Sequence, residues 1–320
     1  MKRAVLVFNP ACGGAAESVD AIRAALQAHF ELVVLETSRE RDADACAKLA
    51  LASSPDLVVA AGGDGTISMV AGALVGTQVP LGIVPRGTSN SIAAGLGIPR
   101  DLAGAVGTIV TGAHHRIDTA RANGRSMMLH AALGLHAAAV GHAPREAKNR
   151  WGVLAYLMEG LTELGQLEPF LLEIETESET VRCRATNVMV ANVAPLKTLF
   201  AQGPAAIASD DGELDVTIVA AASIAEVVVT GLHLFRTSSR GEAVTRDNVG
   251  YLSAKRVRIV TDPPQPLLVD GEPAGEGALD VTCVPSSLTV VGAETLHADP
   301  NQASEKLEGL PGLEVATKIR

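Results

Sequence analysis

Runs of consecutive apolar residues alternate with stretches of helical spacing over roughly the first third of the chain. The apolar runs lie at residues 4–8, 32–35, 57–61 and 81–84. The stretches with helical spacing lie at residues 17–30, 42–51, 67–74 and 91–96. Unbroken apolar runs are typical of parallel strands, because helices cover such strands on both faces. The alternation therefore predicts an α/β domain with a parallel sheet and helices on both of its faces.

The pattern changes near residue 115, where apolar and polar positions begin to alternate singly. Asn123-Gly124 separates two such stretches, 117–121 and 126–132, and this dipeptide is a strong hairpin signal. Further strands are expected at 170–176, 181–191, 214–219, 254–260, 266–269, 279–284 and 288–291. Helices are expected at 146–164 and 224–235. This half of the chain is predicted to be mostly antiparallel, as in a β-sandwich.

The 320 residues suffice for two domains. We expect a Rossmann-like α/β domain over residues 1–120 and a β-sandwich domain over residues 121–297. The polar tail, residues 298–320, is expected either to pack back on the first domain or to remain loose.

Charge and composition narrow the classes of function. The chain has a net charge of −10 and only 2 % aromatic residues, whereas nucleic-acid binders usually combine a basic stripe with stacking aromatics. Residues 1–125 hold 11 basic and 11 acidic side chains, so the whole acidic excess lies in residues 126–320. A neutral first part either suits a site that receives a polyanion or reflects ordinary surface variation.

Neither a targeting segment nor a membrane span is evident in the pattern. The apolar run at residues 4–8 is too short for a signal sequence, and no run approaches the ~20 apolar residues of a spanning helix. The four cysteines (Cys12, Cys46, Cys183 and Cys283) are widely spaced and contain no CxxC pair. We therefore expect a reduced, cytoplasmic protein.

The clearest chemical signal is Gly62-Gly63-Asp64-Gly65-Thr66, which follows an expected buried strand and precedes a helix. Glycines in such a loop let backbone N–H groups approach phosphate oxygens at a helix N-terminus. Asp64 can orient a magnesium ion or a hydroxyl, and Thr66 adds a hydroxyl donor. The simpler interpretation is a tight turn capped by Asp64 and Thr66.

Two further glycine-containing loops follow the expected strands at 81–84 and 4–8. They read Pro85-Arg86-Gly87-Thr88-Ser89-Asn90 and Asn9-Pro10-Ala11-Cys12-Gly13-Gly14. Parallel strands present their carboxyl ends at one edge of a sheet, so all three loops are expected to converge there. Arg86 is either a phosphate ligand or an ordinary surface arginine. The sequence holds no Walker loop and no clean dinucleotide fingerprint, so a metal ion is expected to share the phosphate charge.

Two acidic turns carry candidates in the second part of the chain. Val269-Asp270-Gly271-Glu272-Pro273 places two carboxylates at an expected hairpin tip, where one can act as a base toward a hydroxyl. Ser209-Asp210-Asp211-Gly212-Glu213-Leu214-Asp215 gathers oxygen ligands that suit Mg²⁺ or Ca²⁺. Taken singly, each segment is more typical of a solvated acidic turn than of a functional site.

In this order the motifs resemble the diacylglycerol kinase and sphingosine kinase catalytic-domain family, in its bacterial soluble lipid-kinase form. The resemblance spans residues 3–293. It rests on Asn9-Pro10 with Gly13-Gly14, residues 62–66, residues 85–88 with Asn90, Asp211-Gly212 with Leu214-Asp215, Asp270-Gly271-Glu272 and residues 152–156. It implies an N-terminal domain like that of NAD kinase and phosphofructokinase, a C-terminal β-sandwich, and an active site in the cleft between them.

The resemblance also implies roles for individual residues. The nucleotide-binding positions would be Asn9, Thr37, Gly62, Gly63, Asp64, Gly65, Thr66, Gly87, Thr88 and Asn90. Glu272 would be the proton acceptor for the lipid hydroxyl, and Asp64 a second catalytic residue. A structural Mg²⁺ would be held largely by main-chain carbonyls of Ala208, Asp211 and Glu213.

The implied reaction is direct transfer of the γ-phosphate of ATP to a lipid hydroxyl, assisted by Mg²⁺. The resemblance implies a peripheral enzyme at the inner face of the membrane, with a homodimer as an open question and without a nucleic-acid partner. Ser91 and His136 stand where many bacterial members carry aspartate. These replacements keep open a nucleotide- or lipid-binding regulator without catalysis. NAD kinase is a further alternative, which the loop at 85–90 disfavours.

Overall fold

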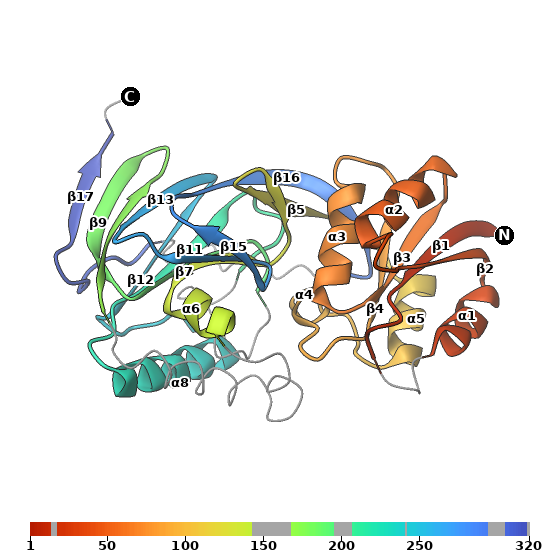
Figure 1. Ribbon diagram of the computed structural model, residues 1–320, viewed down its shortest axis with the longest axis horizontal. Helices are drawn as coiled ribbons and strands as arrows, with labels where there is room; N and C mark the ends of the chain where they lie inside the picture. Colours follow the sequence, from red (N-terminus) through yellow and green to blue (C-terminus); the bar gives the residue numbers. More distant parts are fainter. Residues whose placement is uncertain (14–17, 143–167, 195–206, 241, 294–304, 319–320) are drawn as a thin grey trace. The chain divides into compact units, whose positions relative to one another are not determined.

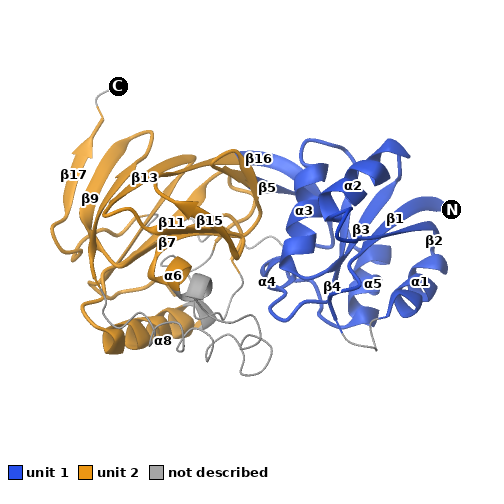
Figure 2. Cartoon of the chain, in the orientation of Figure 1, with its two compact units in different colours: residues 1–119, 284–295 blue, residues 120–283, 296–320 orange. Residues whose placement is uncertain are grey.

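The computed structural model describes residues 1–13, 18–142, 168–194, 207–240, 242–293 and 305–318. The chain forms two compact units (Figure 2). Unit 1 comprises residues 1–119 and 284–295, and unit 2 comprises residues 120–283 and 296–320. The expected helix at 146–164 and the motif at 152–156 lie outside the described residues.

Unit 1 is built around parallel strands in the order β2-β1-β3-β4. The strands are β1 (Lys2–Phe8), β2 (Phe30–Glu36), β3 (Leu57–Gly62) and β4 (Leu81–Pro85). The helices are α1 (Val19–Gln27), α2 (Ala43–Ala52), α3 (Asp64–Leu74), α4 (Ser91–Gly95) and α5 (Leu102–Thr111). Figure 1 shows α2 and α3 on one face of this sheet and α1 and α5 on the other. Every residue of β3 and β4 is buried, which confirms the predicted parallel α/β domain.

Unit 2 contains two mainly antiparallel sheets, as predicted for a β-sandwich. The first has the order β17-β9-β8-β13-β16 and the second β12-β11-β10-β7-β14-β15. The first sheet's strands are β8 (Phe170–Glu175), β9 (Glu179–Ala185), β13 (Arg256–Asp262), β16 (Leu279–Val291) and β17 (Glu314–Thr317). The second sheet's strands are β7 (His130–Gly134), β10 (Asn187–Ala191), β11 (Leu214–Val219), β12 (Val249–Ala254), β14 (Pro266–Val269) and β15 (Glu272–Glu276).

The remaining elements of unit 2 are the helices α6 (Leu135–His142) and α8 (Ile224–Arg240) and the short strand β6 (Arg125–Met127). Strand β5 (His114–Ala122) pairs with both β16 and β6. The predicted hairpin at Asn123-Gly124 is confirmed, since both residues have positive φ angles between β5 and β6. Buried side chains of the two sheets, including Leu133, Phe170 and Ile259, form one core. None of the described helices is long and apolar enough to cross a membrane.

The expected strand at 181–191 is two strands, β9 and β10, in different sheets. The chain changes sheet at Thr186, which is buried and donates hydrogen bonds from both its N–H and its hydroxyl to the carbonyl of Val219, at 2.8 and 3.1 Å. The expected strands at 279–284 and 288–291 are instead one strand, β16. Its residue Val290 pairs in parallel with Leu81 of β4, so residues 284–295 belong to unit 1 rather than to the second domain as expected.

The tail does not pack on the first domain, and that expectation is wrong for its described part. Strand β17 pairs antiparallel with β9, and Lys306 forms a β-bridge with Tyr251. Leu307 and Leu310 are buried in the core of unit 2. The physical reason is that these two leucines cover apolar surface that the β-sandwich would otherwise expose.

Candidate active site

The three glycine-containing loops of unit 1 converge at the carboxyl ends of β1, β3 and β4, as predicted. The Asn9 amide Nδ2 donates to Thr66 Oγ1 at 2.8 Å. The Arg86 guanidinium donates to the carbonyl of Asn9 at 2.7 Å, and the Arg86 N–H donates to the carbonyl of Gly62 at 2.8 Å. Each loop is therefore hydrogen-bonded to another, which gives the edge a fixed shape before any ligand arrives.

Gly63 and Gly87 allow two of these loops to touch. A Cβ atom added to Gly87 would lie 2.7 Å from the Cα of Gly63, and one added to Gly63 would lie 3.3 Å from the Cα of Gly87. The 2.7 Å contact leaves no room for a side chain at Gly87, and the 3.3 Å contact leaves little room at Gly63. These glycines therefore allow the two loops to pack against each other. The sequence pattern alone did not distinguish this role from the approach of backbone N–H groups to a phosphate.

Gly65 differs from these two glycines because open space surrounds it. A Cβ atom added there would meet nothing within 4 Å. It lies in the first turn of α3, which begins at Asp64, earlier than the expected residue 67. Gly63 is the N-cap of this helix and provides no side-chain hydrogen bond to it. An open first turn without a capping side chain suits an anionic oxygen.

Asp64 and Asn90 fix the backbone on the side of α4. The Asp64 carboxylate accepts a hydrogen bond from the N–H of Ile92 at 2.9 Å. Asn90 has a left-handed conformation (φ 51°), and its Oδ1 accepts a hydrogen bond from the Gly87 N–H at 2.6 Å. Asp64 is thus a helix cap, as the simpler interpretation expected, but it caps α4 rather than its own helix.

Arg86 is not a surface arginine. Its side chain is 5 % exposed, and its guanidinium lies 4.2 Å from the centre of the Phe8 ring. Through this stacking and its hydrogen bond to Asn9, Arg86 holds the loop that follows β1 in place. The sequence pointed to Arg86 but did not identify Phe8 as its partner.

Thr37 and Thr88 complete the predicted nucleotide-binding set. Thr37 follows β2, is half-buried, and donates its N–H to the carbonyl of Phe8 at 2.9 Å. Thr88 is exposed within the loop that follows β4. Both therefore stand at the same edge of the sheet as the three glycine-containing loops.

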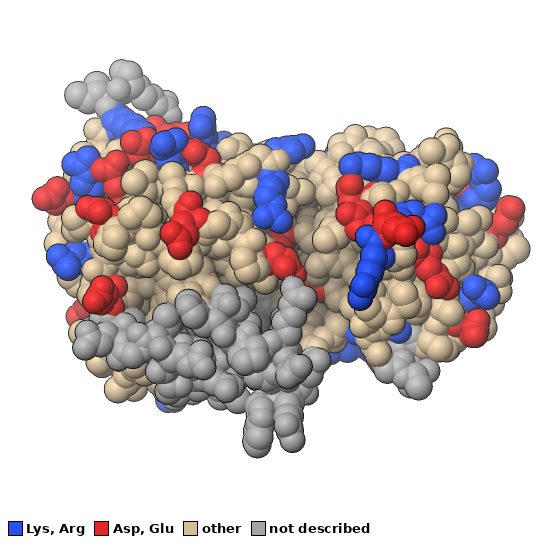
Figure 3. Space-filling view, viewed as in Figure 1, with Lys and Arg blue, Asp and Glu red and all other residues tan. Residues whose placement is uncertain are grey.

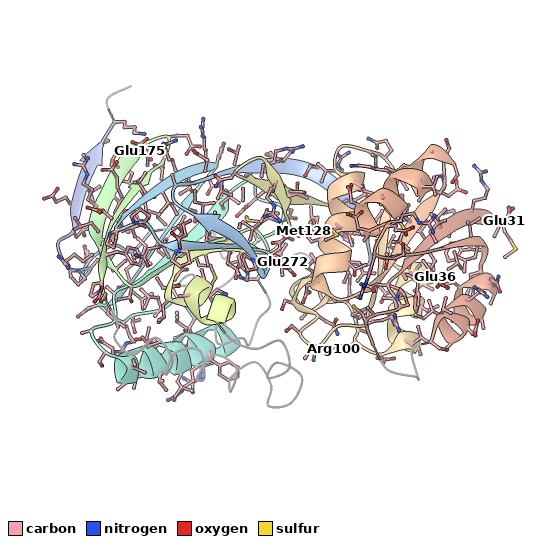
Figure 4. All side chains as sticks on the ribbon, in the orientation of Figure 1. Glu31, Glu36, Arg100, Met128, Glu175 and Glu272 are labelled. Atoms are coloured by element: carbon pink, nitrogen blue, oxygen red, sulfur yellow. The ribbon has the colours of Figure 1, made fainter. Side chains whose placement is uncertain are left out.

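The two carboxylates of the β14–β15 turn have different roles. Asp270 accepts hydrogen bonds from the N–H groups of Met128, Leu129 and His130 at 2.8, 2.8 and 3.2 Å. Asp270 and Gly271 both have positive φ angles, as in a type I′ turn. Glu272, labelled in Figure 4 at the start of β15, is exposed, and its side chain makes no hydrogen bond or ion pair within the described part of the chain. The Asp270 side chain is thus held by the backbone, whereas the Glu272 side chain is exposed.

The turn at Ala208, Asp211 and Glu213, predicted to bind a metal ion, offers oxygen donors and has one internal hydrogen bond. Ala208 is buried, Asp211 is exposed, and the Asp211 side chain accepts the Glu213 N–H at 3.0 Å. Gly212 has a φ of 79°. Across the described residues, no three His, Cys, Asp or Glu side chains gather as a metal site. Carbonyl and carboxylate oxygens are nevertheless the donors that Mg²⁺ and Ca²⁺ prefer.

Ser91 and His136 lie in structured surroundings. Ser91 opens α4 directly after Asn90. His136 is buried, its N–H donates to Asn187 Oδ1 at 3.0 Å, and its ring lies 5.5 Å from that of His130. Burial, reinforced by His130, lowers the pKa of His136 to about 3. His136 is therefore a neutral core group at neutral pH, not a substitute for a carboxylate.

Comparison with known proteins shows which families and relatives this chain resembles. A model of the diacylglycerol kinase catalytic domain matches residues 3–122, and a model of the YegS C-terminal NAD kinase β-sandwich-like domain matches residues 130–292. An uncharacterized Synechocystis protein is 36 % identical over 89 % of this chain and 69 % of its own length. A Bacillus subtilis diacylglycerol kinase is 30 % identical over 86 % of this chain and 91 % of its own length.

A solved structure shares the fold. The crystal structure of a diacylglycerol kinase from Bacillus anthracis superposes with a TM-score of 0.68 at 20 % identity, over 93 % of this chain and 97 % of that one. The α/β unit followed by a β-sandwich is thus the architecture of that structure as well.

Proposed function

This chain belongs to the diacylglycerol kinase catalytic-domain family and is a lipid kinase that uses ATP; on that premise we propose that it phosphorylates the free hydroxyl of diacylglycerol, with Glu272 as proton acceptor. The contrast between the two carboxylates of the β14–β15 turn carries the proposal. Asp270 is held by three backbone N–H groups, whereas Glu272 is exposed without such partners in the described chain.

Unit 1 is assigned to the nucleotide. Its first-turn N–H groups at α3 are assigned to phosphate oxygens, because Gly65 leaves the approach open and Gly63 adds no capping side chain. Asn9, Thr66, Gly87 and Asn90 maintain the loop shape through their mutual hydrogen bonds. From the same edge of the sheet, we also assign Thr37, Gly62 and Thr88 to the nucleotide.

Glu272 is assigned the role of accepting the proton of the lipid hydroxyl. As the hydroxyl oxygen attacks the γ-phosphorus, its O–H bond breaks and the proton passes to the Glu272 carboxylate, while ADP leaves. The protein's main contribution to such a reaction is positioning and charge stabilisation.

A magnesium ion, when bound with ATP, would supply neutralisation of charge on the phosphate oxygens. Asp64 is the acidic residue of the phosphate loop and is assigned to that cation. The carbonyls of Ala208 and Glu213, with Asp211, are assigned to a separate structural cation, since their donor atoms are all oxygen.

The lipid is proposed from the names of relatives, because diacylglycerol kinase is the printed name of the Bacillus subtilis protein. A sphingoid base, phosphatidylglycerol and a polyprenol also present a hydroxyl beside an apolar tail. We place the reaction at a membrane surface, where all of these lipids reside.

The experiment is a phosphate-transfer assay with radiolabelled ATP and mixed micelles of each lipid. Label in the organic phase with diacylglycerol supports the proposal, and label in another lipid corrects the substrate. Glu272→Gln should lower kcat by a factor of about 10² to 10⁴ with the ATP affinity unchanged. Glu276→Gln, an exposed glutamate of the same strand, is the matched control and should retain activity. ATP binding without transfer to any lipid would instead identify a regulator.

A further inference from the structure

Helix α8 exposes three of its large apolar side chains. Val229 and Leu232 are each 50 % exposed and Phe235 is 37 % exposed. Their spacing of three residues keeps them on one side of the helix. Figure 1 shows α8 outside the two sheets of unit 2. This outward stripe of α8, defined by Val229, Leu232 and Phe235, is not explained by the catalytic assignments.

The inward side of α8 is more polar than this stripe. Thr230 and Thr237 are buried, and the Asn248 amide donates to both Thr230 Oγ1 and Glu226 Oε1, at 3.0 and 2.9 Å. Leu234 provides the apolar contact, in a small cluster with Val244, Val249 and Tyr251. In the described part of the chain the helix is thus anchored by hydrogen bonds and by buried or half-buried apolar residues, whereas Val229, Leu232 and Phe235 are exposed. The usual surface helix of a globular protein instead turns its large apolar side chains toward the core.

The charges of α8 are also distinctive for this acidic chain. Arg236 and Arg240 are exposed, whereas the helix's one acid, Glu226, is half-buried and bonded to Asn248 and to the N–H of Ala222. At 100° per residue both arginines lie beside the outward stripe. The next acid along the chain is Glu242. Over the face drawn in Figure 3, by contrast, basic and acidic side chains are interspersed.

We propose that α8 is the membrane-docking helix of this protein, with the outward stripe entering an anionic lipid surface and Arg236 and Arg240 contacting lipid phosphates. An interfacial helix needs an apolar face and flanking cations, and α8 has both. The charge complementarity favours anionic lipid as the occupant, because the rest of the chain is acidic and would be repelled. The inference rests on the proposed lipid-kinase function only in requiring a membrane-borne substrate.

The test is sedimentation of the full chain with sucrose-loaded vesicles of phosphatidylcholine, with and without phosphatidylglycerol, and without ATP. The wild-type chain is expected to bind the anionic vesicles and to dissociate as salt rises. Leu232→Glu should lower the partition coefficient about tenfold or more, because it places a charge in the apolar boundary. Replacing both Arg236 and Arg240 by Gln should lower it about tenfold at low salt.

Leu49→Glu is the matched control, because Leu49 of α2 is also 50 % exposed but lies in unit 1. It should bind vesicles as the wild type does. All variants should keep the wild-type melting temperature, since the altered side chains face solvent. The proposal is overturned if wild type ignores vesicles, if Leu232→Glu binds normally, or if light scattering shows that this variant only dissociates a dimer. Binding is measured without catalysis, so an inactive protein that still docks through α8 would refute only the proposed function.

Discussion

The glycine-containing loops of unit 1 and the β14–β15 turn of unit 2 present their polar groups in opposite ways. In unit 1, Asn9 and Arg86 are bonded to neighbouring loops and Asn90 is bonded within its own loop, while the space around Gly65 remains open. In unit 2, Asp270 is bonded to backbone N–H groups, whereas Glu272 is exposed. The proposed phosphate site is thus surrounded by side chains held in hydrogen bonds, whereas the proposed proton acceptor is a side chain without such bonds in the described chain.

The largest effect on stability is expected at Asp270. Asp270→Ala should lower the free energy of unfolding by about 2–4 kcal/mol, because three N–H groups lose a charged acceptor. Glu272→Gln should change it by less than about 0.5 kcal/mol, as is usual for an exposed side chain. Urea denaturation of both variants checks this contrast. Equal stability losses would show that the two carboxylates do not differ in the way described.

A smaller effect is expected from the glycines of unit 1. Gly87→Ala should lower the free energy of unfolding by about 1–3 kcal/mol, since its Cβ would meet the Gly63 backbone at 2.7 Å. Gly65→Ala should leave stability unchanged or raise it by up to about 1 kcal/mol, because alanine is the better helix residue. Calorimetric titration with ATP should show weaker binding for Gly65→Ala despite its normal fold. Unaltered ATP affinity in that variant would contradict the proposal that the phosphates bind at the first turn of α3.

At neutral pH the smallest effect on the free energy of unfolding is expected at His136 of unit 2, because its contribution changes only as the pH falls. Its pKa is lowered to about 3 by burial, so the unfolded chain takes up a proton first as the pH falls below about 6.5. This residue should therefore lower the free energy of unfolding by up to about 1.4 kcal/mol per pH unit between pH 6.5 and pH 3. In unit 1, His29 and His114 are exposed.

Urea denaturation at pH 7.5 and 5.5 measures that slope. His136→Gln should show a shallower loss of stability on acidification than the wild-type chain, whatever its stability at pH 7.5. Parallel pH dependence in the two proteins would exclude His136 as the source.

Much of the fold was predictable because local pattern and burial agree. The runs at 4–8, 57–61 and 81–84 became β1, β3 and β4, since strands covered on both faces must be apolar throughout. The change of sheet at Thr186 was not predictable, because residues 181–191 keep strand character through the corner. The tail was misplaced for a similar reason: Leu307 and Leu310 signal burial but not the surface that they cover.

The sequence by itself determined the two architectures, the convergence of three glycine-containing loops, and the acidic turn that holds Asp270 and Glu272. These features depend on local periodicity and on the shared edge of parallel strands. Only the tertiary structure decided which glycines serve packing, that Arg86 stacks on Phe8, and which carboxylate is bonded to backbone. It also left Val229, Leu232 and Phe235 of α8 exposed. Such distinctions depend on neighbours distant in the chain, so residue type and spacing do not encode them.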